Sequence, residues 1–207
     1  LGEGYSGSAV GSPIIVGGNI YTYSGTTIMK VDKDTGLILK TGKMVGGSSF
    51  AINSPTYADG MIFIGLSNGR VQAFNAETLD SLWVYTDKLG GQPNCPIAYC
   101  DGYIYTGFWN SETKQANFAC LSVTDEDTTQ TTEAKLATWT YTHNGFYWAG
   151  AYACKDYVLV TTDDGESDYL TGHGSVLSLN PKTGKLIDSL QATNVGDLRS
   201  SVCYDEE

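Results

Sequence analysis

The sequence has little positive charge, only two histidines and no long apolar run. It contains 12 lysines and arginines against 23 aspartates and glutamates, which gives a formal net charge of −11. A chain this acidic repels nucleic acid and anionic membrane surfaces, and no basic cluster offsets that repulsion. No apolar stretch approaches the roughly 18 residues of a membrane-spanning helix. We therefore expect no nucleic-acid partner and no membrane insertion.

Motifs of the common enzyme classes are missing as well. The sequence has no phosphate-binding loop, and its Gly-x-Ser-x-Gly stretch at 65–69 lacks the following helix that a nucleophile elbow requires. Its five cysteines match no zinc spacing, and we interpret them as small buried residues, with a Cys95–Cys100 disulfide as the alternative. The absence of any Asn-x-Ser/Thr acceptor favours a bacterial source. These absences favour a non-catalytic role, although paired carboxylates acting on glycans stay open.

The sequence does contain an internal repeat. Gly18, Gly60 and Gly102 follow one another at a spacing of 42 residues, and each lies between two short apolar segments. Related copies of the first apolar segment occur at 153–159 and 201–205. Aspartate–glycine and glycine–glycine pairs are typical of the tight turns that join antiparallel strands. Each copy therefore begins with a predicted β-hairpin.

A second turn pattern recurs later in each copy. It starts with Asp or Asn and has Thr three residues on, at 32–36, 75–79 and 180–184. The Asx side chain starts the turn by accepting from its own backbone, and glycine at the fifth position permits positive φ. Leu79 takes the glycine position in the second copy, so we expect that turn to differ in detail.

Four antiparallel strands in about 40–50 residues predict one blade of a β-propeller. A charged fraction of only 17%, with many Gly, Thr, Ser and Tyr residues, also suits an all-β chain. We predict an all-β fold: a β-propeller of four-stranded antiparallel blades, with about four blades and the first strand of a fifth. The single, partial domain covers 1–207, and its approximate blades are 12–44, 54–86, 95–142 and 150–191, with the next starting at 200–207.

Residues 71–83 resemble the repeat of the pyrroloquinoline-quinone (PQQ)-like propeller superfamily. The pattern is a small-apolar strand, then Asn75, Thr78 and Trp83. The third copy has a matching tryptophan at 139, whereas the first and fourth have Lys40 and Asp188 there. The superfamily includes quinoprotein dehydrogenases, an outer-membrane assembly lipoprotein and many surface proteins, so the resemblance implies a fold more than a function.

The resemblance also bears on cofactors and partners. Quinoprotein dehydrogenases of the superfamily hold PQQ with a vicinal cysteine disulfide, a tryptophan floor and a calcium ion. No two cysteines are adjacent here, so the residues argue against PQQ, and we expect no cofactor other than calcium. Superfamily members usually close a ring of about seven or eight blades. Four blades would leave apolar faces open, so we expect further sequence or a second chain to complete the ring.

Three long segments are the candidate binding loops. In a propeller, the loops from the second to the third strand and from one blade to the next emerge on the same face. We therefore expect 108–115, 143–148 and 163–174 to be neighbours, and exposed loops on a rigid scaffold commonly bind ligands. Aromatic rings beside amides suit a sugar or a peptide, although the same rings can belong to the core. The candidate ligand-binding residues are Trp109, Asn110, His143, Asn144, Tyr147, Trp148 and His173.

An acidic loop in the fourth blade is a candidate calcium site. Calcium favours several oxygen ligands within a short span. The candidate ligands are Asp163, Asp164, Glu166 and Asp168, which do not follow the EF-hand pattern. A solvated acidic loop is the alternative.

These observations favour a secreted or cell-surface protein of the bacterial envelope. We expect a non-catalytic propeller that binds a carbohydrate or a protein partner through its long loops. One alternative is an envelope assembly scaffold similar to the outer-membrane lipoprotein. The other is a quinone-dependent or glycan-active enzyme.

Overall fold

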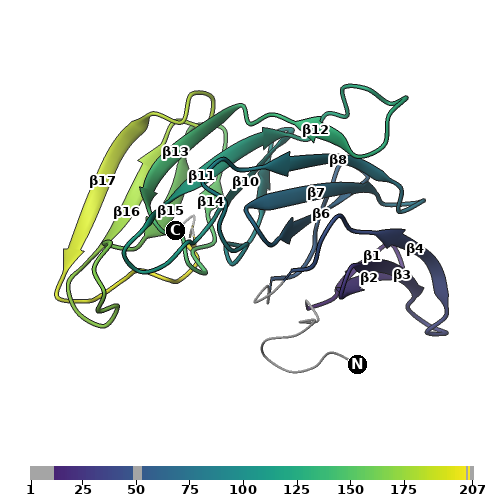
Figure 1. Ribbon diagram of the computed structural model, residues 1–207, viewed down its shortest axis with the longest axis horizontal. Coiled ribbons are helices and arrows are strands. Elements are labelled where there is room, and N and C mark those ends of the chain that lie inside the picture. Colours follow the sequence, from purple (N-terminus) through teal and green to yellow (C-terminus); the bar gives the residue numbers. More distant parts are fainter. Residues whose placement is uncertain (1–11, 49–52, 204, 206–207) are drawn as a thin grey trace.

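The computed structural model describes residues 12–48, 53–203 and 205, and all of its regular structure there is β. No helix in these ranges is long and apolar enough to cross a membrane. The strands form four sheets that stand side by side along an arc, with β1–β4 at one end and β17 at the other (Figure 1). Four antiparallel blades in an open arc confirm the prediction of a partial propeller.

Each blade contains four antiparallel strands in sequence order. The first contains β1 (Ile14–Val16), β2 (Asn19–Ser24), β3 (Thr27–Asp32) and β4 (Ile38–Lys43). The second contains β5 (Thr56–Ala58), β6 (Met61–Leu66), β7 (Arg70–Asn75) and β8 (Ser81–Thr86). The third contains β9 (Ala98–Cys100), β10 (Tyr103–Gly107), β11 (Gln115–Ser122) and β13 (Trp139–Asn144). The fourth contains β14 (Tyr152–Ala153), β15 (Val158–Thr162), β16 (His173–Leu179) and β17 (Leu186–Thr193).

The second blade has a fifth strand that the sequence does not predict. Strand β12 (Glu133–Lys135) leaves the third blade and pairs in parallel with β8. The Lys135 side chain is buried there. Its charge is compensated by Glu126, which lies 2.6 Å from Nζ, and by the Trp83 ring, whose centre is 5.3 Å away. The insertion of the third blade therefore covers the outer edge of its neighbour.

Successive blades are joined by one recurring hydrogen bond. Tyr21 Oη donates to the Ala76 carbonyl at 2.9 Å, and Trp139 Nε1 donates to the Pro181 carbonyl at 2.8 Å. Between the second and third blades, Trp83 Nε1 donates to the Val123 carbonyl at 3.4 Å. In each case the accepting carbonyl lies just beyond the third strand of the next blade. The tryptophan of the repeat thus connects one blade to the next. In the first blade, where Lys40 has the tryptophan position, Tyr21 of β2 makes the comparable bond.

The turn at Leu79 does not differ from its counterparts, so that expectation was wrong. Leu79 has φ 60°, close to the 72° of Gly36 and the 68° of Gly184. Its amide donates to the Asn75 carbonyl at 2.9 Å, as the Gly36 amide does to Asp32. A left-handed leucine costs roughly 1–2 kcal/mol. Burial of the side chain, which is only 2% exposed, offsets this strain.

The expected start of a fifth blade lies partly outside the described residues, which omit 204, 206 and 207. Residues 200–203 form no strand. The Val202 amide donates to the Gly150 carbonyl at 2.9 Å, which places this segment beside the start of the fourth blade.

Candidate functional site at the junction of blades three and four

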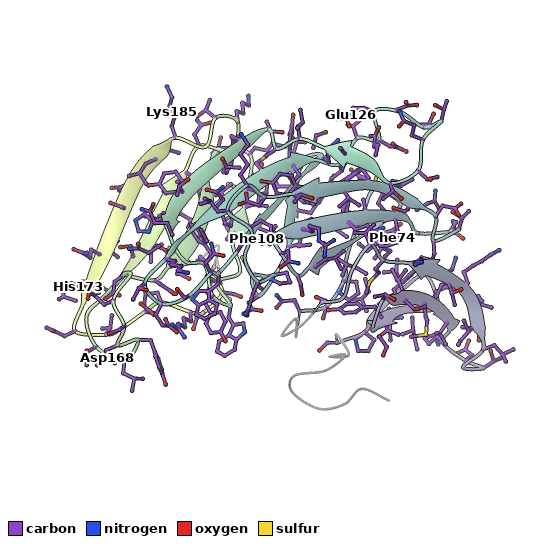
Figure 2. All side chains as sticks on the ribbon, viewed as in Figure 1. Phe74, Phe108, Glu126, Asp168, His173 and Lys185 are labelled. Carbon is purple, nitrogen blue, oxygen red and sulfur yellow. The ribbon has the colours of Figure 1, made fainter. Side chains whose placement is uncertain are left out.

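Four connections meet at one end of the third and fourth blades. They are 108–114, 145–151, 163–172 and the segment 194–201 that follows β17. Figure 2 shows Asp168 and His173 at this edge, and Lys185 and Glu126 at the opposite edge. The contacts described below confirm the prediction that the three long loops are neighbours on one face.

Three aromatic rings form a stack on this face. The ring centres of Trp109 and Tyr147 are 4.6 Å apart, and those of Tyr147 and Trp148 are 4.2 Å apart. Trp148 is 37% exposed and has a left-handed backbone, with φ 59°. Phe146 is fully buried against Phe118, so the core interpretation holds for Phe146 and not for Trp148. A strained backbone that presents an exposed ring is a common feature of functional sites.

An arginine lies beside the aromatic stack. Arg199 donates to Glu112 and, at 2.8 Å, to Asp197. Its guanidinium carbon is 4.6 Å from the centre of the Tyr147 ring and 4.9 Å from that of Tyr169. Stacking and paired carboxylates are the contacts that a planar guanidinium prefers. Arg199 therefore ties three loops and the final segment together.

Asp163 is the buried member of this cluster. It is 1% exposed, and its carboxylate accepts no hydrogen bond from the described residues. Its nearest cation is the Nε of Arg199, at 3.7 Å. Burial, with a smaller contribution from the charge of Asp197, raises its pKa to about 7 against the opposing effect of Arg199.

This pKa predicts that acid stabilises the fold through Asp163. A carboxyl with a higher pKa in the folded than in the unfolded chain binds its proton more tightly when folded. The contribution of Asp163 to the stability of the fold is fully present when the pH is below 3.8, the ordinary pKa of an aspartate. This contribution is lost as the pH rises through about 7, the pKa in the folded chain. Urea unfolding in metal-free buffer gives the free energy of unfolding of the parent and of Asp163→Asn. The difference between these two free energies should change by up to about 1.4 kcal/mol per pH unit in this window. A difference independent of pH would contradict the assignment.

The polar residues predicted for ligand binding have structural partners. Asn110 Nδ2 donates to the Gln115 carbonyl at 2.8 Å, and Asn144 Nδ2 donates to the Asp164 carbonyl at 2.6 Å. His143 is half-buried, with Nδ1 at 3.1 Å from Thr162, and desolvation lowers its pKa. His173 is exposed at the start of β16. Their roles in ligand binding stay predictions, and Trp148 and His173 are the exposed members of the predicted set.

The four predicted calcium ligands do not converge. Asp164 accepts from the His173 and Glu166 amides, and Asp168 accepts from Leu170 and Thr171. In the described part of the chain, the carboxylates that come together are Glu112, Asp163 and Asp197, whose oxygens lie within 4.8 Å of one another.

Sequence reasoning missed Glu112, Tyr169, Asp197 and Arg199 as members of the site. Glu112 and Tyr169 lie in loops already selected for their length, but nothing in the sequence singles them out. Arg199 is one of only two arginines in a chain with 23 acidic residues, and that scarcity was the available signal.

The arrangement resembles known propellers. The family model described as "Outer membrane protein assembly factor BamB" matches residues 5–108. No curated protein matches the chain. Quinohemoprotein alcohol dehydrogenase ADHIIG from Pseudomonas putida HK5 is 13% identical over 89% of this chain and 34% of its own, with a TM-score of 0.67. BamB from Moraxella catarrhalis is 16% identical over 92% of this chain and 53% of its own, with a TM-score of 0.63.

A computationally designed protein, Ika4, is also similar. It is 15% identical over 84% of this chain and 91% of its own, with a TM-score of 0.56. At such identities these likenesses show the fold alone. The chain spans 34% of the length of the dehydrogenase and 53% of that of BamB.

The expectation that the chain holds no PQQ stays a prediction, and it rests on the cysteines. The five cysteines are free, and no two of them are adjacent in sequence. The Cys95–Cys100 disulfide is not formed, and burial raises the pKa of the Cys95 thiol to about 12. Cys95 and Cys120 are buried small residues, as the first interpretation expected, whereas Cys203 is exposed.

Proposed function

From the premise that this chain belongs to the family of the outer membrane protein assembly factor BamB, within the PQQ-like propeller superfamily, we propose that it is a non-catalytic binding protein. Its ligand is a carbohydrate, bound on the loop face at the junction of blades three and four. Its location is the bacterial cell envelope, either at the surface or secreted. The observation that supports this most is the stack of Trp109, Tyr147 and Trp148, in which the Trp148 ring is exposed and the other two are partly buried.

The stack offers what a sugar ring needs. An aromatic face packs against the C–H groups of a pyranose, and polar neighbours fix its orientation. Trp148 is the most exposed ring of the three, and its position is fixed by Tyr147, which itself packs on Arg199. Since the rings are already stacked, little conformational entropy is lost when a ligand binds.

A panel of polysaccharides and arrayed glycans tests this proposal. Trp148→Ala should weaken binding by about 0.5–1.5 kcal/mol, the magnitude of one aromatic packing contact. Titration calorimetry on a glycan that the parent binds measures this loss. Tyr103→Ala is the matched control, since Tyr103 is 38% exposed and lines a cavity with Cys100 and Lys155 outside this face. Equal losses in both variants, or no glycan bound by the parent, would reject the carbohydrate proposal.

The second candidate function is an envelope assembly scaffold. The family match over residues 5–108 favours it, because the model is that of an assembly factor. In this case the same loop face holds a partner protein. Site-specific crosslinking from position 148 in bacterial envelopes should then capture one defined protein, and crosslinking from position 103 should not.

A second copy of the chain is the partner that we propose for the open ends of the arc. Cross-strand pairs align Ile15, Ile20, Val31 and Ile38 in one apolar row across the first blade, on the side away from its core. On the free side of the fourth blade, Val176 pairs with Leu190, which is 68% exposed. Joining the two ends would continue the packing between blades.

Sedimentation velocity tests this self-association. The parent should sediment with twice the mass of one 22.2 kDa chain. Ile38→Asp, which places a charge in the apolar row, should sediment as a single chain. A parent that stays at one chain's mass at high concentration would reject the second-copy proposal.

A further inference from the structure

The acidic cluster beside the aromatic stack has the geometry of a cation site. Glu112, Asp163 and Asp197 come from three different loops, and one oxygen of each lies within 4.8 Å of the others. Calcium binds oxygen ligands at 2.3–2.6 Å. Three oxygens at such separations can therefore surround one ion.

Asp163 supplies a second, independent observation. Its carboxylate is buried, and neither oxygen accepts a hydrogen bond from the residues that the structure describes. The Arg199 Nε that faces it, at 3.7 Å, is also buried without a hydrogen-bond partner. A buried carboxylate is costly when its oxygens accept no hydrogen bond, and the ion pair with Arg199 at 3.7 Å compensates that cost only in part. A carboxylate in this position, aimed into the cluster, indicates a further positive ligand.

The charges of the cluster lead to the same conclusion. When ionised, three carboxylates face one guanidinium, which leaves two negative charges in excess. Among the residues that the structure describes, Arg199 is the one cation that forms ion pairs with these carboxylates. A divalent cation would remove the excess without any further protein group.

We propose that Glu112, Asp163 and Asp197 bind a hard divalent cation, with Ca²⁺ as the best match. All three donors are carboxylate oxygens, which exclude the soft metals that prefer sulfur or imidazole. Loops from separate connections give the adjustable, irregular coordination that Ca²⁺ accepts and that Mg²⁺ tolerates poorly. This cation site lies beside the aromatic stack of the loop face. The proposal that it binds a cation does not depend on the proposal that the stack binds a carbohydrate.

Arg199 acts as the internal competitor of the cation. Its Nη2 donates to Glu112 and Asp197, so an entering ion displaces it from those oxygens. The guanidinium also packs on the rings of Tyr147 and Tyr169, and these contacts do not involve the carboxylate oxygens, so we expect them to remain. Because Tyr147 belongs to the aromatic stack, cation binding changes the charge presented next to Trp148.

Terbium luminescence measures this binding directly. Tb³⁺ substitutes for Ca²⁺ and emits when a nearby tryptophan is excited. The Trp109 ring lies close to Asp163, since a Cβ at Gly145 would lie 2.5 Å from Trp109 Cδ1 and 3.4 Å from Asp163 Oδ2. The parent should show sensitised emission that Ca²⁺ abolishes by competition. Asp163→Asn should weaken Tb³⁺ binding by at least about 10- to 100-fold, because loss of an outer-shell partner alone has an effect of that size.

Asp168→Asn is the matched control. Asp168 lies in the same acidic loop but accepts hydrogen bonds from its own segment and remains outside the cluster. This variant should keep the parent affinity. Equal weakening by both substitutions, or emission that Ca²⁺ does not compete away, would mean diffuse binding to an acidic surface and would overturn the proposal.

A second variant keeps the proposal testable if Asp163→Asn folds poorly. Arg199→Met removes the competitor and leaves the three carboxylates without compensation. Ca²⁺ should therefore raise the Tm of Arg199→Met by more than it raises the Tm of the parent. An equal or smaller shift in Arg199→Met would overturn the site.

Discussion

Replacing Trp83 with alanine should lower the free energy of unfolding by about 3–5 kcal/mol. The side chain is fully buried between the second and third blades, and its ring centre lies 5.7 Å from that of Phe63. Its indole N–H reaches the Val123 carbonyl of the next blade. The substitution removes buried apolar surface and leaves a cavity. It also removes the aromatic ring over which the Lys135 ammonium lies.

Urea denaturation followed by circular dichroism gives this loss as a shift in midpoint. Trp148→Ala is the control, because its ring is 37% exposed and stacks on Tyr147 at the loop face, so it should change stability far less. Similar stabilities of the Trp83→Ala variant and the parent would contradict the stacking of blades around this residue.

Arg199→Met should cost about 3–5 kcal/mol at pH 8 in metal-free buffer. The side chains of Asp163 and Asp197 are each 1% exposed, so removal of the guanidinium leaves buried charge without compensation. The substitution also removes the packing of Arg199 on Tyr147 and Tyr169. Lowering the pH toward 5 should restore part of the loss, because Asp163 then takes up a proton.

Arg70→Met is the matched control for this substitution. Arg70, the other arginine of the chain, donates to the Ser67 carbonyl and forms none of the ion pairs recorded among the described residues. Its replacement should have a small effect that does not depend on pH. A loss in Arg199→Met that stays constant between pH 8 and pH 5 would mean that packing, and not charge, is what Arg199 contributes.

The sequence was sufficient for the features that depend on local chemistry. Asp59–Gly60 and Asp101–Gly102 both have positive φ at their two positions, as the spacing of the turns predicts. The repeat length then determines the number of strands in a blade. The rule that alternate connections share one face was enough to predict that the loops containing Trp109 and Tyr147 are neighbours, as their ring contact shows.

The features that sequence reasoning missed depend on distant contacts. Arg199 and Glu112 are 87 residues apart, and no local pattern predicts that they meet. Strand β12 pairs with a blade other than its own, so its contacts are also non-local. Leu79 was misjudged because the turn preference was weighed without the burial that offsets the strain. In each case the outcome depends on tertiary contacts that the local sequence does not contain.

The central claim is that the loops of the third and fourth blades form one surface, the loop face. A double-mutant cycle between Glu112 and Arg199 tests this claim most directly. The cycle measures the free energy of unfolding of the parent, Glu112→Gln, Arg199→Met and the double variant in metal-free buffer. Residues in contact couple by about 0.5–3 kcal/mol, and distant residues add independently within about 0.5 kcal/mol. A coupling of at least about 1 kcal/mol, weaker at high salt, is the result that we predict. Additive losses would contradict the account, because the loops of the third and fourth blades would then not form one surface.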